Sequence, residues 1–257
     1  MTVPEFLLLV VAGVGAGLVG SMAGLASLIS YPALLATGIP PLSANVTNTV
    51  AMVFNGVGSV SASRPELSGQ ARRLVPLIGV GVLGGVAGAA LLLLTPATAF
   101  ERIVPFLIAG ASVAMLVQRP PRELAAEGAA RAAGRPHRDS WGLLLGTFLI
   151  SIYGGYFGAA AGVGMLAMFL LVTGEGFPRS NAMRNVVLGC ANGIAAVGYA
   201  VFADVSWWAA LPLAVGLLVG GRLGPRVVRR VPATLLRRVI AVLGLGLALR
   251  LGLDAFG

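Results

Sequence analysis

The chain has 257 residues, 57% of them hydrophobic and only 11% charged, and its formal net charge is +9. A soluble domain has about 25% charged residues, so this composition excludes a water-soluble globular protein and predicts an integral membrane protein. All of the positive charge comes from arginine, because the sequence contains no lysine. The arginines are scattered through short loops, so we attribute them to membrane topology and expect no nucleic-acid partner.

Apolar stretches follow one another along nearly the whole chain. They cover residues 5–36, 43–62, 74–100, 103–118, 141–173, 182–203, 205–221 and 235–253. Most of them have the roughly 20 residues that a membrane-spanning helix needs. The sequence therefore predicts an all-α polytopic membrane protein with the lipid bilayer as its surroundings.

The second half of the sequence repeats the first. The matching residues are Ser43 with Ser180, Asn48 with Asn185, Asn55-Gly56 with Asn192-Gly193, Gly84-Gly85 with Gly220-Gly221, and Arg102 with Arg238. We therefore divide the chain into a first membrane repeat over residues 1–118, an arginine-rich linker over 119–140 and a second membrane repeat over 141–257. Many secondary transporters are built from two such copies, with the substrate site between them.

The distribution of arginine indicates that the two repeats have inverted topology. The loop after stretch 43–62 carries Arg64, Arg72 and Arg73, whereas its counterpart near Asp204 carries none. The next loop reverses this pattern, with Arg102 alone in the first repeat and six arginines over residues 222–238 in the second. Because arginine and lysine collect in cytoplasmic loops, equivalent loops of the two repeats are expected on opposite sides of the membrane.

The side on which each loop lies constrains the first stretch of each repeat. With the linker and residues 222–238 both cytoplasmic, stretch 141–173 must begin and end on the same side. A straight helix of that length would measure about 48 Å, against a hydrocarbon core of about 30 Å. We predict a hairpin of two short helices bent between Gly154 and Gly164, with a matching bend near Gly20–Gly24. Each repeat then has about five helical elements, opens with a pair of short, glycine-broken helices, and leaves both chain termini external.

Glycines, prolines and small polar residues at these bends resemble those of a known family. The segments that carry the resemblance are Gly17–Gly24, Gly38-Ile39-Pro40 and Ala44–Asn48 in the first repeat, and Gly158–Gly164, Gly176-Phe177-Pro178 and Asn181–Asn185 in the second. They are similar to the sulfite exporter TauE/SafE family of permeases. The resemblance implies transport of small, mostly sulfur-containing anions such as sulfite or organosulfonates, and we expect the protein in the bacterial inner (plasma) membrane.

The two bends and a set of symmetric amides are the candidate substrate-binding groups. A broken helix in a membrane is tolerated where it lines a wet cavity, and helix N-termini direct N–H groups at anions. An unpaired amide in hydrocarbon costs roughly 2–7 kcal/mol, so each buried asparagine needs a partner. The candidate residues are Gly24, Ser27, Thr47, Asn48, Asn55, Gly162, Gly164, Arg184, Asn185 and Asn192.

Some of these residues have a second interpretation. Asn55 and Asn192 also fit hydrogen bonding between helices. Arg184 fits either a guanidinium fork on an anion or a side chain that extends to the membrane interface. The spacing of Gly84 and Gly88, and of Gly220 and Gly224, fits close helix packing.

The interiors of the apolar stretches lack acidic residues and histidine, which limits the classes of transporter that the sequence fits. Every carboxylate lies in a terminus or a predicted loop, and the only histidine, His137, lies in the linker. A cation transporter normally keeps an acid within its spans, so we expect a small anionic substrate, no metal or other cofactor, and no enzymatic activity. The favoured function is an anion permease with its site between the repeats near the bilayer midplane. The alternative is a non-transporting membrane scaffold or assembly factor, and a homodimer is compatible with the many small-residue faces.

Overall fold

The computed structural model describes residues 2–133, 141–227 and 233–256. Linker residues Arg135, His137 and Arg138, and also Arg229 and Arg230, lie outside the described residues. Within the described segments the chain forms helices and no strand. Five of these helices, α1, α5, α6, α10 and the first 18 residues of α11, are long and apolar enough to cross a membrane. The predicted all-α polytopic membrane protein is confirmed.

The helices follow the order predicted from the apolar stretches, with small differences at their ends. The first repeat forms α1 (Val3–Ala23), α2 (Ser27–Ala36), α3 (Pro41–Ala62), α4 (Arg64–Leu67), α5 (Ala71–Leu93) and α6 (Ala97–Val117). The linker contributes α7 (Pro121–Ala132), and the second repeat forms α8 (Trp141–Tyr156), α9 (Ala161–Thr173), α10 (Phe177–Phe202), α11 (Trp207–Val227) and α12 (Ala233–Phe256). The predicted boundary after residue 100 was wrong, because α6 begins directly after Pro96, which serves as its N-cap.

Both repeats open with the predicted helix break, but the first helix of the first repeat is not short. In the second repeat α8 has 16 residues and α9 has 13, whereas α1 has 21 and α2 only 10. Gly13 and Gly17 inside α1 pack against α11, and neither interrupts the helix. The helix ends only at Gly24, which adopts a left-handed conformation with φ 76°, a conformation that glycine reaches without steric cost.

The second break is a tighter and more strained turn. Gly158 has φ 77°, and Ala160 has φ 61° as the only residue other than glycine with positive φ in the described segments. A left-handed alanine costs roughly 1–2 kcal/mol. Hydrogen bonds hold the turn: the Tyr153 hydroxyl donates to the Ala159 carbonyl oxygen at 2.7 Å, and the amides of Phe157 and Gly158 both donate to the Tyr153 carbonyl oxygen.

The helices of one repeat pack reciprocally against those of the other. Helix α1 lies along α11 and α5 lies along α8, while α3 contacts α11 and α10 contacts α5. Glycine allows the close approach: a Cβ on Gly17 would lie 2.6 Å from the Leu217 carbonyl oxygen, and one on Gly84 would lie 2.5 Å from the Phe148 carbonyl oxygen. The predicted packing role of Gly84 and Gly220 is confirmed.

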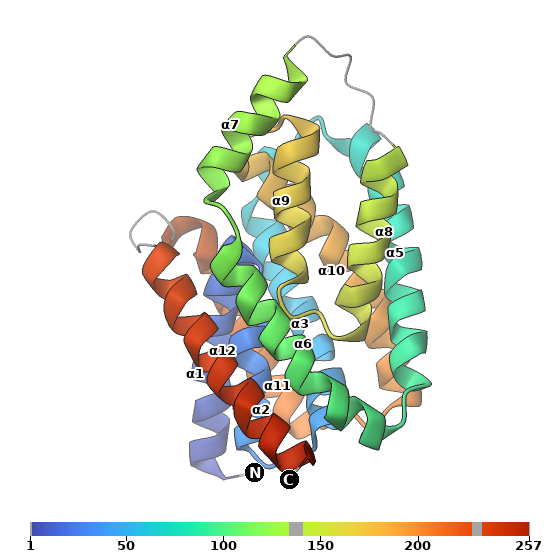
Figure 1. Ribbon diagram of the computed structural model, residues 1–257, viewed down its shortest axis with the longest axis vertical. Coiled ribbons are helices and arrows are strands. Elements are labelled where there is room, and N and C mark those ends of the chain that lie inside the picture. The colour runs from blue at the N-terminus through green and yellow to red at the C-terminus, as the bar shows by residue number, and fades with distance from the viewer. Residues whose placement is uncertain (1, 134–140, 228–232, 257) are drawn as a thin grey trace.

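The two ends of the molecule differ in what they carry. Both chain termini lie at one end of the long axis and α7 lies at the other (Figure 1). The α8–α9 hairpin lies in the half nearer α7, whereas α2 lies in the half nearer the termini. Inverted repeats require an arrangement of this kind, although the inversion itself stays a prediction.

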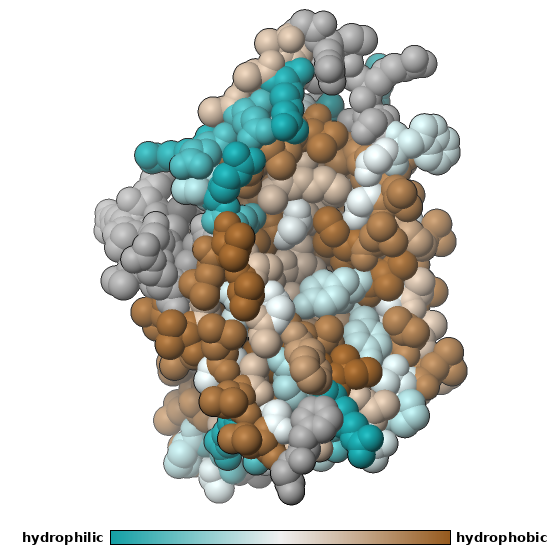
Figure 2. Space-filling view, in the orientation of Figure 1, coloured by the Kyte–Doolittle hydropathy of each residue, from teal (hydrophilic) through white to brown (hydrophobic). Residues whose placement is uncertain are grey.

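The surface matches the membrane assignment. Hydrophobic side chains cover most of the middle of the visible face, and hydrophilic ones gather over α7 and at the opposite end (Figure 2). Large apolar residues such as Leu83, Phe106 and Leu211 are more than 60% exposed. In water such a surface would aggregate, whereas in a bilayer it faces lipid.

Candidate functional site

The two helix breaks meet in the interior of the molecule. An ideal Cβ placed on Gly24 would lie 2.5 Å from the carbonyl carbon of Gly162, and one placed on Gly162 would lie 2.6 Å from the Cα of Gly24. No side chain fits at either position, so glycine is what lets the two backbones touch. The structure therefore joins two candidate residues that lie in different halves of the sequence.

A cavity of about 50 Å³ lies beside this contact and is lined by both breaks together with α3 and α10. Its polar side chains are Asn55, Ser59, Arg184, Asn185 and Asn192, and much of the remaining wall is glycine. A water molecule needs about 10–15 Å³ by this measure. The cavity therefore has room for a few waters or for one small polyatomic ion.

Arg184 is the only charged residue of the cavity wall, and its side chain is almost completely enclosed, with 1% of its surface exposed. Its Nη2 donates to the carbonyl oxygens of Gly20 at 2.9 Å and Ser21 at 3.1 Å, and to Asn185 Oδ1. These carbonyls end helix α1, where the helix dipole is negative and attracts a cation. The guanidinium lies in the interior and does not extend to the membrane interface.

The second terminal nitrogen of Arg184 has no hydrogen-bond partner among the residues that the structure describes. Its Nη1 is buried and unpaired, and it lies 2.6 Å from the position that a Cβ on Gly24 would take. No carboxylate lines the cavity, and among the described residues Arg184 forms no ion pair. A buried charge without a counter-ion is costly.

Amide groups supply further hydrogen-bonding capacity around the guanidinium. Asn185 accepts from Arg184 through Oδ1, and its Nδ2 donates to the Ser21 carbonyl oxygen at 3.4 Å. The Nδ2 of Asn55 lies beside Gly20, another residue of the cavity wall. The cavity thus combines one cation with amide donors and no acid.

Four of the predicted site residues lie outside the cavity wall. Asn48 joins α3 to α2: its Oδ1 accepts from Ser30 Oγ at 2.5 Å and its Nδ2 donates to Ser27 Oγ at 3.3 Å. Thr47 Oγ1 accepts from the backbone amide of Ser206 just before α11, at 3.0 Å. Gly164 borders a separate groove beside α6. A binding role for these four residues stays a prediction.

Sequence reasoning missed two asparagines that hold the breaks in place. Asn181 Nδ2 on α10 donates to the Ser21 carbonyl oxygen at the end of α1, and Asn45 Nδ2 on α3 donates to the Tyr156 carbonyl oxygen at the end of α8, both at 2.9 Å. Each of these amides belongs to one repeat and satisfies the end of the first helix of the other. The available signal was an asparagine in the first turns of an apolar helix in both repeats.

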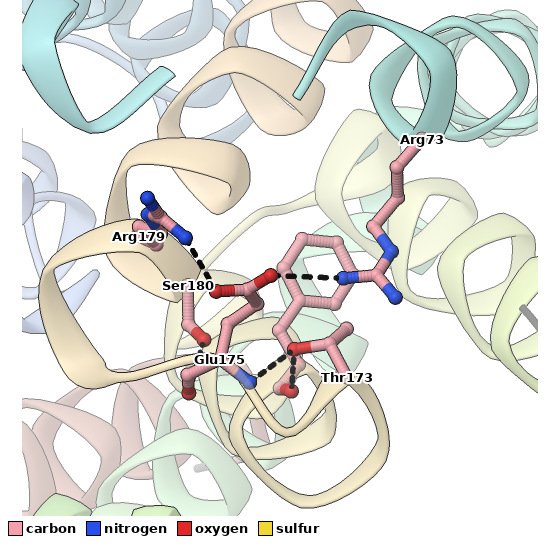
Figure 3. Close-up of polar contacts among 6 residues, drawn as sticks. Arg73, Thr173, Glu175, Arg179 and Ser180 are labelled. Carbon is pink, nitrogen blue, oxygen red and sulfur yellow. Dashed lines mark hydrogen bonds and ion pairs between the residues drawn. The ribbon is translucent and has the colours of Figure 1, made fainter. Parts of the chain in front are cut away.

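A polar cluster fixes the start of α10, the helix that carries Arg184. Glu175, in the α9–α10 loop, lies between two arginines, with Arg73 Nη1 of α5 at 3.4 Å and Arg179 Nη1 at 3.3 Å (Figure 3). Thr173 Oγ1 accepts from the Glu175 amide at 3.3 Å, and Ser180 Oγ donates to the Glu175 carbonyl oxygen at 3.3 Å. The cluster ties the end of the α8–α9 hairpin to α5.

The spanning helices, the broken helices that meet inside them and the cavity between them define a polytopic membrane transporter. The sulfite exporter TauE/SafE family matches residues 9–251, and the chain belongs to this family. The predicted resemblance is confirmed. The chain is a membrane permease and not an enzyme, in line with its family and its relatives.

Several relatives match over almost their full length. The chain is 27% identical to the probable membrane transporter protein ORF9 of Sinorhizobium sp, with 96% of this chain and 92% of the relative covered. It is 26% identical to the probable membrane transporter protein YfcA of Escherichia coli strain K12, covering 94% of this chain and 87% of the relative. A probable membrane transporter protein of Haemophilus influenzae is 27% identical over 90% of this chain and 88% of the relative. No solved structure matches the chain.

Proposed function

We propose that the protein is a permease for small anions, with sulfite and organosulfonates as the favoured substrates, and that the cavity at the two helix breaks is the binding site. The observation that carries this proposal is the buried, unpaired Nη1 of Arg184 in a cavity without a carboxylate. The description of the family, sulfite exporter, supports the choice of sulfur oxyanions.

The chemistry of the cavity suits an oxyanion. A hydrogen bond to a charged group contributes about 1.5–3 kcal/mol, and a guanidinium presents its donors in a fixed planar fork that matches an oxygen pair. In Arg184 one terminal nitrogen is occupied by the end of α1 and the other is free for a ligand. An anion there would complete the partners of the guanidinium.

The size of the cavity also limits the substrate. About 50 Å³ accommodates a compact ion, whereas an organosulfonate with a longer carbon chain needs additional space. The contact between Gly24 and Gly162 forms part of the wall, so entry of a larger substrate requires the two helix breaks to separate. Such separation would also open a path for transport, as expected where broken helices of two repeats meet.

A panel of anions tests the proposal. The purified protein is screened by thermal shift against sulfite, thiosulfate, sulfoacetate, taurine and acetate, and anions that raise Tm are then assayed for flux into proteoliposomes. Ligands that bind only the folded state raise Tm with concentration, so we expect sulfite or sulfoacetate to raise Tm and to be transported. If no anion raises Tm or crosses the membrane, the anion-permease assignment is wrong and the scaffold alternative gains support.

A further inference from the structure

A groove on the membrane-facing side of the molecule is larger than the anion cavity and chemically different from it. It has a volume of about 460 Å³ and lies between α6 and the α8–α9 hairpin. Its lining includes Phe106, Gly110 and Ala114 on α6, Leu149 and Tyr153 on α8, and the bend at Ala160. Gly110 faces open space, with no neighbouring atom within 4 Å of an added Cβ.

Several polar groups of the groove wall are paired within the wall itself. Tyr153 is the only lining residue with a polar side chain, and its hydroxyl donates to the Ala159 carbonyl oxygen at 2.7 Å. Within the bend, the Ala161 amide donates to the Gly158 carbonyl oxygen, and the amides of Val163 and Gly164 donate to that of Ala160. A buried water needs 2–4 polar partners, and the apolar side chains that make up most of this wall supply none.

An empty groove of this size would be unfavourable. An engineered apolar cavity of about 150 Å³ stays dry and binds benzene, and this groove has about three times that volume. Atoms that line a void lose their dispersion contacts on that side. An apolar occupant would restore these contacts.

The equivalent space beside α2, in the first repeat, is filled by a helix of the second repeat. Helix α12 packs against α2, and only about 10 Å³ remains among Tyr31, Pro32 and Leu247. The pairing of Arg102 with Arg238 makes Gly110 of α6 the counterpart of Gly246 of α12. At the α8–α9 hairpin of the second repeat, the corresponding helix is α6, and it makes little contact with the hairpin. A hydrogen bond from Gln118 Nε2 to the Val163 carbonyl oxygen, at 3.1 Å, joins α6 to α9 just beyond the groove.

We propose that an acyl chain of a membrane phospholipid occupies this groove and takes the place of helix packing against the α8–α9 hairpin. Both walls belong to helices of the membrane region, and their outer residues, Phe106 and Leu149, are exposed apolar side chains. Hydrocarbon is therefore the medium at the mouth of the groove. The acyl chain would contact the bend at Ala160. The next residue, Ala161, lines both this groove and the anion cavity. This assignment is independent of the identity of the anion.

Photolabelling in a bilayer tests the proposal. The full chain is reconstituted into phosphatidylethanolamine and phosphatidylglycerol vesicles that contain a phosphatidylcholine with a diazirine in its acyl chain, and adducts are mapped by peptide mass spectrometry. We expect adducts on residues 106–114 and 149–161 at a yield several-fold above that on the exposed face of α12. Equal yields on both surfaces would overturn the proposal, as would labelling of the groove by a water-soluble carbene reagent alone.

A matched pair of variants gives a second readout. Gly110→Leu places a side chain in the groove, whereas Gly246→Leu adds the same side chain at the equivalent exposed position outside it. Native mass spectrometry of the detergent-purified proteins should show that Gly110→Leu loses a phospholipid that the parent and Gly246→Leu retain. If Gly110→Leu keeps both its lipid and its adducts, or if the groove cross-links to a second copy of the chain, the acyl chain is not its occupant.

Discussion

Arg184 is a cation that neutral partners hold in the interior. Backbone carbonyls at the end of α1 and the side chain of Asn185 take up Nη2, and Nη1 remains unpaired. Removing such a group affects two functions, because the same side chain caps a helix and offers a donor to the cavity. A variant that keeps the charge but changes the geometry separates these effects.

We predict that Arg184→Lys weakens anion binding about 10- to 100-fold, because an ammonium cannot reproduce the guanidinium fork and one charge-assisted bond is worth about 1.5–3 kcal/mol. Isothermal titration calorimetry with the anion that gives the largest thermal shift measures the change in Kd. Arg250→Lys, on an exposed position of α12, is the control and should bind like the parent. An unchanged Kd in Arg184→Lys would remove Arg184 from the binding site.

Asn185 and Asn48 occupy matching positions in the two repeats but have different surroundings. Asn185 lines the cavity, whereas Asn48 joins α3 to α2 through Ser27 and Ser30. We expect Asn185→Ala to raise Kd about 5- to 100-fold with a small change in Tm. Asn48→Ala should lower Tm, because burying an unsatisfied hydroxyl costs about 1–3 kcal/mol, and it should leave Kd close to that of the parent. If Asn48→Ala instead raises Kd and Asn185→Ala only lowers Tm, Asn48 belongs to the binding site.

Among the helices, α1 shows most directly how glycine sets the packing distance. A Cβ on Gly17 would lie 2.6 Å from the Leu217 carbonyl oxygen and 2.7 Å from the Gly221 amide nitrogen, whereas a Cβ on Gly15 has no neighbour within 4 Å. The two positions are half a turn apart, so one faces α11 and the other does not. The pair allows a comparison within one helix.

We expect Gly17→Ala to destabilise the protein by about 1–3 kcal/mol, the usual cost of overpacking. Gly15→Ala should be neutral or stabilising by about 0.5–1 kcal/mol, because alanine is the better helix former. Thermal unfolding in detergent, followed by tryptophan fluorescence, measures both. Equal Tm values for the two variants would mean that α11 moves to accommodate a methyl group and that the close approach is not required.

At the scale of the whole molecule, the arrangement of its ends supports the inverted topology. Both termini lie opposite α7 (Figure 1), and the predicted layout places the arginines on the cytoplasmic side, apart from Arg102, Arg250 and the buried Arg184. Helix α1 pairs with α11 as α8 pairs with α5, which is the exchange that a pseudo-two-fold axis relating the repeats would produce. We propose that the linker is cytoplasmic and both termini are external.

Reporter fusions test this orientation. A fusion after residue 257 should report an external C-terminus, and a fusion inserted in the 119–140 linker should report the cytoplasm. An internal signal from the C-terminus together with an external one from the linker would reverse the orientation while leaving the fold intact. Signals from the same side at both positions would contradict the fold itself, because the C-terminus and the linker helix α7 lie at opposite ends of the molecule.

The sequence by itself determined the features that follow from local composition and from lipid as a solvent. Apolar stretches of sufficient length must form helices, because lipid cannot satisfy free backbone groups. The span 141–173 had to turn back on itself, because one straight helix would be much too long for the hydrocarbon core. The same reasoning placed the first bend near Gly20–Gly24, where α1 ends, but it predicted a short first helix, whereas α1 has 21 residues.

Only the tertiary structure decided which candidate residues meet. Gly24 and Gly162 are far apart in the chain yet touch, and Arg184 is buried against the end of α1 from the other repeat. Asn48 and Asn185 are equivalent in sequence, but one contacts α2 and the other the cavity. Which face of a helix meets a cavity depends on how its neighbours are placed around it, and that placement arises from long-range packing that no local pattern encodes.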